Sequence, residues 1–156
     1  RKYGDVMISL RPPADEWEIA WRKNNKIHPL VNDWTFFGVG VVVEDCERAT
    51  EYFLNLGFSL SKDVCEYHDL GVKLSRVEVG SMNFEFIETT ADSSVYQECL
   101  NKRGEGIADM SFIVKNVKSE TDSLISKGAA LLISTNDYSL LDTRKEGNMI
   151  IRLSQE

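Results

Sequence analysis

Two stretches of the chain share one pattern of apolar and polar positions. In the first, an apolar strand leads through Asp45 into an amphipathic stretch that ends at Gly57, and in the second an apolar strand leads through Asn116 into an amphipathic stretch that ends at Gly128. An Asx residue is suited to cap the start of a helix, and glycine readily takes the left-handed conformation that follows a helix end. The pattern therefore predicts two strand–helix pairs, and 71 residues separate the corresponding positions of the two copies.

Three extended segments follow each predicted helix. They cover residues 57–63, 71–79 and 82–88 in the first copy and 129–135, 138–144 and 148–154 in the second. This order predicts an α+β fold of two βαβββ repeats that form a curved mixed sheet around a cavity. We expect an N-terminal arm with a short helix (1–35) and one domain (36–156), divided into a first module (36–90), a linker (91–106) and a second module (107–156). A helix is expected within the linker, over residues 95–101.

Alternate residues of a strand point to opposite faces of a sheet, so the sequence alone assigns side chains to faces. Four strands each have one wholly apolar face, which we assign to the side packed against the helices. On the first strand this assignment puts Phe37 and Val39 toward the helices and Phe36 and Gly38 on the other side. The opposite faces of the other three strands carry Asn83, Glu85, Asp109, Ser111, Arg152 and Ser154. On a curved sheet these polar side chains line the concave surface.

The repeat also pairs positions between the two copies. The same offset of 71 residues relates Gly38 to Asp109. The last strands align through the glycines that precede them, which makes Glu85 of the first copy equivalent to Arg152 of the second.

Two segments of the chain resemble the vicinal oxygen chelate superfamily, which includes glyoxalase I, bleomycin-resistance proteins, extradiol dioxygenases and methylmalonyl-CoA epimerase. Residues 100–107 (LNKRGEGI), followed by a strand, look like the segment before the second-half ligand strand of the epimerases. Residues 45–58, with Ala49, Tyr52 and Phe53, look like the first-helix signature of the superfamily. The resemblance covers residues 36–156 and implies the two-repeat fold already expected from the pattern.

Members with a metal present His, Glu or Gln, His and Glu on the first, fourth, fifth and eighth strands, and the matching positions here hold Gly38, Glu85, Asp109 and Arg152. Glycine offers no ligand atom, and an arginine brings a fixed positive charge into the ligand shell. We therefore expect no metal and no other cofactor. A weak, water-rich Mg²⁺ between Glu85 and Asp109 is the alternative, but the Arg152 guanidinium would compete for the same carboxylates.

Two interpretations of Glu85, Asp109 and Arg152 follow. In the first they form a structural ion cluster, since a lone buried charge is costly. In the second they are catalytic: Arg152 stabilises a carboxylate or enolate oxygen while Glu85 or Asp109 moves a proton on the adjacent carbon. The candidate ligand-binding residues beside them are Asn83, Ser111 and Ser154.

The resemblance to methylmalonyl-CoA epimerase implies a metal-independent isomerase or lyase of the glyoxalase type, acting next to the carbonyl of a small acyl thioester or carboxylic acid. The first alternative is a domain of the bleomycin-resistance type that binds a small molecule, such as an acyl-CoA or a carboxylate, without chemistry. The second is a subunit-association module, suggested by Trp17 and Trp21 in the N-terminal arm. By analogy with the superfamily we expect a homodimer.

Composition narrows the partners. The 156-residue chain carries a formal charge of −7 and has a pI near 4.9, which opposes binding to a nucleic-acid backbone. It contains no run of roughly twenty apolar residues of the kind that spans a bilayer. Cys46, Cys65 and Cys99 are widely spaced and suggest neither a disulfide framework nor a thiolate zinc site. The sequence thus predicts a soluble, cytoplasmic protein.

Overall fold

The computed structural model describes residue 31 and residues 33–155, so the predicted N-terminal helix with Trp17 and Trp21 lies outside the described residues. The first repeat contains β1 (Thr35–Val43), α2 (Cys46–Asn55), β2 (Ser59–Tyr67), β3 (Val72–Val79) and β4 (Met82–Thr89). The second contains β5 (Gly106–Ile113), α4 (Val117–Ser126), β6 (Ala130–Ser134), β7 (Tyr138–Thr143), the short helix α5 (Arg144–Gly147) and β8 (Met149–Ser154). The helix α3 (Val95–Arg103) joins the two repeats, as predicted for the linker.

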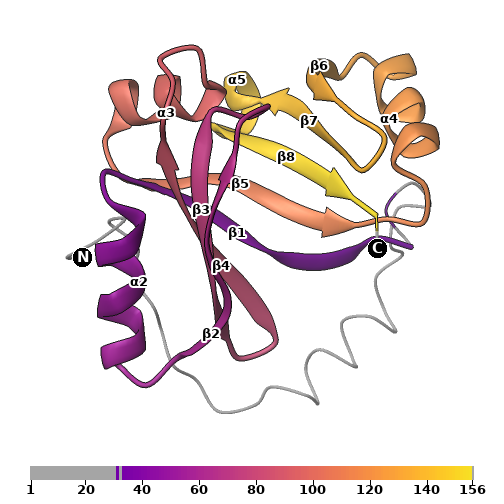
Figure 1. The fold of residues 1–156 in the computed structure, drawn as a ribbon. Coiled ribbons are helices and arrows are strands. Elements are labelled where there is room, and N and C mark those ends of the chain that lie inside the picture. The colour runs from indigo at the N-terminus through magenta and orange to yellow at the C-terminus, as the bar shows by residue number, and fades with distance from the viewer. Residues whose placement is uncertain (1–30, 32, 156) are drawn as a thin grey trace.

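The eight strands within residues 33–155 form one mixed sheet in the order β2-β3-β4-β1-β5-β8-β7-β6. The pairs β1–β4 and β5–β8 are parallel, and the two repeats meet through the antiparallel pair β1–β5. The sheet curves strongly, so that the two halves face one another (Figure 1). The predicted α+β architecture of two βαβββ repeats is confirmed.

The register of the central strands makes the repeat a pseudo-twofold relationship. Gly38 pairs with Ser111 and Gly40 with Asp109, and the offset of 71 residues exchanges these two pairs. On the next strands outward, Glu85 of β4 pairs with Gly40 of β1, and Arg152 of β8 pairs with Ser111 of β5. The predicted equivalence of Glu85 and Arg152 is therefore correct.

The two long helices α2 and α4 begin in the same way. The Asp45 side chain accepts a hydrogen bond from the Arg48 amide at 2.9 Å, and the Asn116 side chain accepts one from the Ser119 amide at 2.8 Å. Both caps have extended backbone, with φ of −149°. An N-cap of this kind satisfies a helix N–H that has no partner within the helix, and it fixes where each helix starts.

A buried hydroxyl pair links each of these helices to the middle one of the three strands that follow it. Thr50 on α2 bonds Ser75 on β3 with 2.5 Å between the hydroxyl oxygens, and Thr121 on α4 bonds Ser139 on β7 at 2.6 Å. All four residues are buried, so each hydroxyl needs the other as a partner. The duplication thus extends to the interior contacts of the two helices.

The helices divide between the two faces of the sheet. α2 packs on the outer face of the first half, where Phe53 contacts Phe84 and Phe86, and α4 packs on the outer face of the second half through Val117 and Leu124. α3 instead covers one end of the inner face (Figure 1). There its Tyr96 and Cys99 join an apolar cluster with Val42, Leu70, Val72, Leu74, Ile87, Ala108, Leu140 and Ile150. One end of the concave face is therefore core, and polar side chains occupy its middle.

The predicted faces are wrong at the start of β1. A register shift between Phe36 and Gly38 places a β-bulge at Phe37. A bulge inserts one extra residue, which reverses the alternation on one side of it. Phe36 consequently packs against Phe112, a residue of the outer cluster beneath α4, while the Phe37 ring lies beneath Arg76 on the concave face.

No helix within residues 31 and 33–155 is both long and apolar enough to cross a bilayer.

Candidate functional site

The ion pair between Glu85 and Arg152 occupies the middle of the concave face. Glu85 lies on β4 and Arg152 on β8, and the Arg152 Nη2 contacts Glu85 Oε2. The side chains are 2% and 10% exposed, so both charges are removed from most of the solvent. The strands between them place Gly38 and Gly40 on this face of β1, which leaves room for the long arginine side chain to cross the sheet.

A second guanidinium, that of Arg76 on β3, binds the same carboxylate. Its Nε and Nη2 lie 3.1 and 2.7 Å from Glu85 Oε1. The group stacks over the Phe37 ring, with 4.6 Å from the guanidinium carbon to the ring centroid, a geometry that favours a cation. Glu85 is thus held between two arginines, one on each of its oxygens.

Arg76 is not among the residues predicted from the sequence, although the hairpin β3–β4 contains the signal. Val79 pairs with Met82 across a two-residue turn, and the antiparallel register that follows puts Arg76 directly opposite Glu85. Directly opposed residues of an antiparallel pair share one face of the sheet. A polar residue at 76 was therefore predictable as a neighbour of Glu85.

Asp109 on β5 lies beside this ion pair but has its own partners. Its Oδ1 accepts a hydrogen bond from the Gly40 amide at 3.0 Å, and its Oδ2 accepts one from the Tyr96 hydroxyl at 2.6 Å. The Arg152 Nη2 is 3.8 Å from Oδ1, which is an ion-pair distance rather than a hydrogen bond. The structure therefore brings together all three predicted charged residues, and it adds Tyr96 from α3, which no sequence pattern indicated.

Complete burial sets the protonation behaviour of Asp109. The residue has no solvent exposure, and burial raises the pKa of its carboxyl to about 6 even though the bonds from Tyr96 and Gly40 act in the opposite direction. Burial also raises the pKa of the Tyr96 hydroxyl, with a smaller contribution from the adjacent Asp109 charge. Tyr96 therefore remains the donor in this pair at neutral pH.

Gly40 provides the space that Asp109 occupies. A Cβ atom at position 40 would lie 2.5 to 2.6 Å from the carboxylate atoms of Asp109. Any side chain there would displace the carboxylate or the strand. Glycine at this position is required by the close approach of Asp109 and not by an unusual backbone angle.

Arg152 is the cation at the centre of the cluster. Burial, and secondarily the nearby Arg76 charge, lower its pKa to about 10, so the guanidinium stays charged at neutral pH. Its Nε is buried and has no hydrogen-bond partner among the described residues. Lys62 on β2 lies opposite Arg76 and donates to the Tyr67 hydroxyl. Three cations thus line this half of the concave face, together with the carboxylates of Glu85 and Asp109 and that of Glu78, which pairs with Asn83.

The cluster does not fit the metal that the family resemblance associates with this place. A Cβ at Gly38, the position matching the first-strand ligand, would lie 2.2 Å from the Asn83 carbonyl oxygen, so no ligand side chain fits there. Arg152 occupies the matching position on the eighth strand and already binds Glu85. Within residues 31 and 33–155, no three His, Cys, Asp or Glu side chains come together in the manner of a metal site. The charged side chains of the cluster pair with one another and do not form the set of ligands that a metal ion requires.

The three predicted ligand-binding residues lie on the same sheet, but two of them are already engaged. The Asn83 amide donates to the Phe37 carbonyl at 3.2 Å, and the Ser111 hydroxyl donates to the Gly38 carbonyl at 3.2 Å. Both bonds hold the bulged start of β1. Ser154 is half-buried at the end of β8, where it pairs with Tyr138.

Comparison with solved structures agrees with this architecture. A hypothetical protein from Bacillus halodurans C-125 superimposes with a TM-score of 0.69 at 17% identity, covering 80% of this chain and 96% of that one. A methylmalonyl-CoA epimerase from Mycobacterium tuberculosis gives 0.67 at 24% identity, with 77% and 86% covered. A methylmalonyl-CoA epimerase in complex with methylmalonyl-CoA and NH4⁺ gives 0.67 at 18% identity, with 78% and 93% covered.

The chain has the vicinal oxygen chelate fold. At these identities the likeness is one of fold. By sequence, no family model and no curated protein matches the chain. Any function of the protein therefore depends on the side chains that this vicinal oxygen chelate sheet carries.

Proposed function

We propose that this protein binds a small carboxylate or acyl thioester on the concave face of its sheet, without a metal. The observation that carries the proposal is the state of Arg76. Its side chain is 26% exposed, its Nε and Nη2 are anchored on Glu85, and its Nη1 makes no hydrogen bond with the described residues. A guanidinium fixed on one edge and open on the other is suited to bind a planar anion.

The charges around Arg76 favour the same ligand class. Arg152 lies on the far side of Glu85, and Lys62 is opposite Arg76 on the neighbouring strand. Neighbouring cations on one face draw an anion even in a chain of net negative charge, because the local field decides contact binding. A methylmalonyl-CoA epimerase of this fold has been solved with methylmalonyl-CoA, which supports an acyl thioester or its acid as the ligand here.

Binding is favoured over chemistry because both carboxylates already have partners. Glu85 meets a guanidinium at each oxygen, and Asp109 accepts hydrogen bonds at each oxygen while fully buried. A general base needs an oxygen within hydrogen-bond reach of the proton that it removes. Both carboxylates are thus engaged within the protein, Glu85 by two arginines and Asp109 by two hydrogen bonds.

A metal-independent epimerase-like activity is the second candidate, and one observation favours it. The pKa of Asp109, raised by burial to about 6, lies near neutral pH, where a group both takes up and releases protons effectively. In such a reaction Asp109 would move the proton next to the substrate carbonyl, and the arginines would stabilise the resulting enolate oxygen.

Calorimetric titration in buffer containing a chelator tests the binding proposal. The ligands are methylmalonyl-CoA, propionyl-CoA and free methylmalonate. We expect one of them to bind, and we expect Arg76→Met to weaken that binding at least tenfold. Arg48→Met, which removes a guanidinium from the exposed side of the outer helix α2, is the matched control and should leave affinity unchanged. Equal affinity of wild type and Arg76→Met for all three would contradict the proposal.

Proton exchange separates the two candidates. The protein is incubated with methylmalonyl-CoA in deuterium oxide, again with chelator, and the α-hydrogen is followed by NMR. The binding function predicts that the proton is retained. Deuterium incorporation that Asp109→Asn abolishes would instead establish the epimerase-like activity.

The homodimer, the cytoplasmic location and the division into arm and domain remain predictions from the sequence. The homodimer can be tested first, by sedimentation of the full chain. The association role suggested for Trp17 and Trp21 concerns residues outside those that the structure describes.

A further inference from the structure

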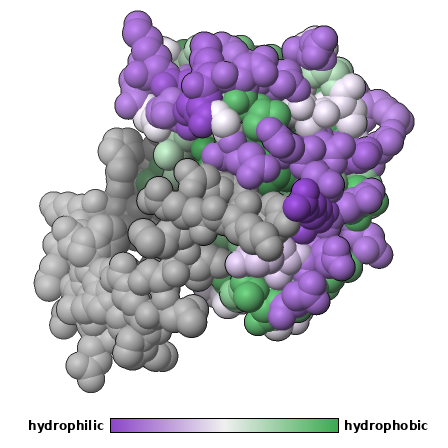
Figure 2. Space-filling view, turned by 90° about the vertical axis from the view of Figure 1, so that its left-hand side faces the viewer, coloured by the Kyte–Doolittle hydropathy of each residue, from purple (hydrophilic) through white to green (hydrophobic). Residues whose placement is uncertain are grey.

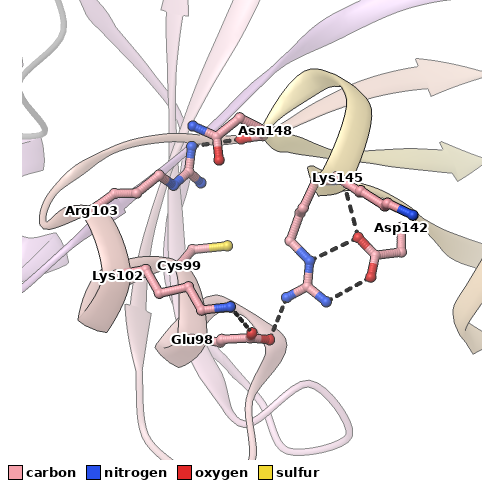
Figure 3. A pocket seen from close by; sticks show the side chains of 8 residues that line it. Glu98, Cys99, Lys102, Arg103, Asp142, Lys145 and Asn148 are labelled. Carbon is pink, nitrogen blue, oxygen red and sulfur yellow. Dashed lines mark hydrogen bonds and ion pairs between the residues drawn. The ribbon is translucent and has the colours of Figure 1, made fainter.

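A separate cavity of about 320 Å³ lies where the C-terminal half of α3 meets α5 and the ends of the strands beside it. Figure 3 shows its lining side chains from close by. They are Glu98, Cys99, Lys102, Arg103, Asp142, Arg144, Lys145 and Asn148. Four of these eight residues are cations and two are carboxylates, so the cavity carries a net positive charge in a chain whose total charge is −7.

The two carboxylates of the cavity form ion pairs with two of its cations. Glu98 accepts a hydrogen bond from Lys102 at 2.5 Å and one from Arg144 at 2.6 Å. Asp142 is bound by Arg144 through two bonds of 2.8 Å. These partners lower the pKa of both acids, that of Asp142 to about 2, so both carboxylates stay ionised over the physiological pH range.

The other two cations have no carboxylate partner among the described residues. The Arg103 Nη1 donates to the Asn148 carbonyl at 2.6 Å, and a neutral acceptor leaves the guanidinium charge uncompensated. Asn148 holds that carbonyl in place from a left-handed conformation, with φ of 56°. Lys145, exposed on α5, makes no hydrogen bond or ion pair with another described residue. Positive charge therefore remains available at the mouth of the cavity.

We propose that this cavity binds the phosphate group of a small phosphorylated molecule. Arginine and lysine together are the usual partners of phosphate, the first through its fork of donors and the second as a mobile charge. The volume lies at the lower end of the range of about 300 to 1,000 Å³ for ligand pockets, which suits a phosphorylated sugar or one nucleotide. The surroundings are hydrophilic: the top of the molecule, where α3 lies, is mostly purple in Figure 2. The proposal does not rest on the concave-face site.

Binding of pyrophosphate to the full chain, measured by calorimetry at low and at moderate salt, is the test. Inorganic phosphate and ADP are titrated beside it, since they separate a site for the free anion from one that also holds a nucleoside. We expect pyrophosphate or ADP to bind and the affinity to fall as salt rises. Lys145→Ala should weaken that binding at least fivefold, and Lys145→Ala combined with Arg103→Ala should abolish it.

Two controls make the result specific. Lys127→Ala, at the C-cap of the outer helix α4, removes the same charge elsewhere and should leave the affinity unchanged. Arg76→Met, on the concave face, should also leave it unchanged, which keeps the two proposed sites distinguishable. Since Lys145 is exposed and makes no contact that the fold needs, its variant should have a native circular dichroism spectrum. Absence of pyrophosphate and ADP binding, or equal losses in Lys145→Ala and Lys127→Ala, would overturn the proposal and identify the cluster as an ordinary ion-pair network.

Discussion

Arg152 on β8 and Glu85 on β4 form an ion pair although two strands, β1 and β5, lie between them in the sheet. On a flat sheet three strand spacings amount to about 14 Å. The curvature of the sheet and the glycines of β1 reduce that separation to contact. The two residues are equivalent positions of the internal repeat, so the same position holds an acidic side chain in the first copy and a basic side chain in the second.

Removing one partner of this pair should destabilise the fold. We expect Arg152→Met to lower the free energy of unfolding by about 3 kcal/mol, because it leaves the buried Glu85 charge with Arg76 alone. Urea denaturation measures the loss. The double variant Glu85→Gln, Arg152→Met should lose less than the single one, and a larger loss in the double variant would contradict a coupled buried pair.

A methyl group at position 40 should be costly. Gly40→Ala places its Cβ within 2.6 Å of the Asp109 carboxylate, and we expect the free energy of unfolding to fall by about 2 kcal/mol or more. Gly147→Ala is the control, since a Cβ there meets its nearest neighbour at 3.8 Å. Thermal unfolding of both variants measures the difference. Similar midpoints for the two would show that the Asp109 carboxylate can move aside without loss of stability.

The buried Asp109 should make stability depend on pH. Its pKa is about 6 in the folded state and about 3.9 in an unfolded chain. Between these values the folded state binds more protons, so stability should fall by about 3 kcal/mol in total as pH rises from about 3 to about 7, with most of the loss between pH 4 and 6.

Two variants check this assignment. Asp109→Asn should remove that part of the pH dependence in denaturation curves measured from pH 4 to 7. Tyr96→Phe should raise the pKa of Asp109 further, because it removes a hydrogen bond that stabilises the ionised form. An unchanged pH profile in Asp109→Asn would assign the dependence to other groups.

The hydroxyl pairs beneath the two helices should contribute similarly. Thr50→Val leaves the buried Ser75 hydroxyl without its partner on α2, and Thr121→Val does the same to Ser139. Each variant should lose about 1 to 2 kcal/mol of unfolding free energy. Chemical denaturation is the measurement, and a large loss in only one of them would show that the two repeats do not share this contact energetically.

The architecture was predictable because its signals are local and occur twice. Asp45 and Asn116 cap helices, and 71 residues separate them as they separate Gly57 from Gly128, so that cap chemistry and spacing together specified the order of elements. Strand alternation likewise placed Glu85, Asp109 and Arg152 on one face. The predicted faces of Phe36 and Phe37 were wrong, because a bulge depends on pairing with the neighbouring strand and cannot be recognised from the sequence of one strand.

The sequence by itself determined the two repeats, the helix ends and the set of charged residues that share the concave face, because these follow from the short-range periods of helices and strands. Only the tertiary structure decided how those charges are partnered. Arg152 reaches Glu85 because the sheet curves, and Tyr96 reaches Asp109 because α3 packs over the inner face. Contacts between distant segments depend on the curvature and packing of the whole sheet, which no local pattern specifies.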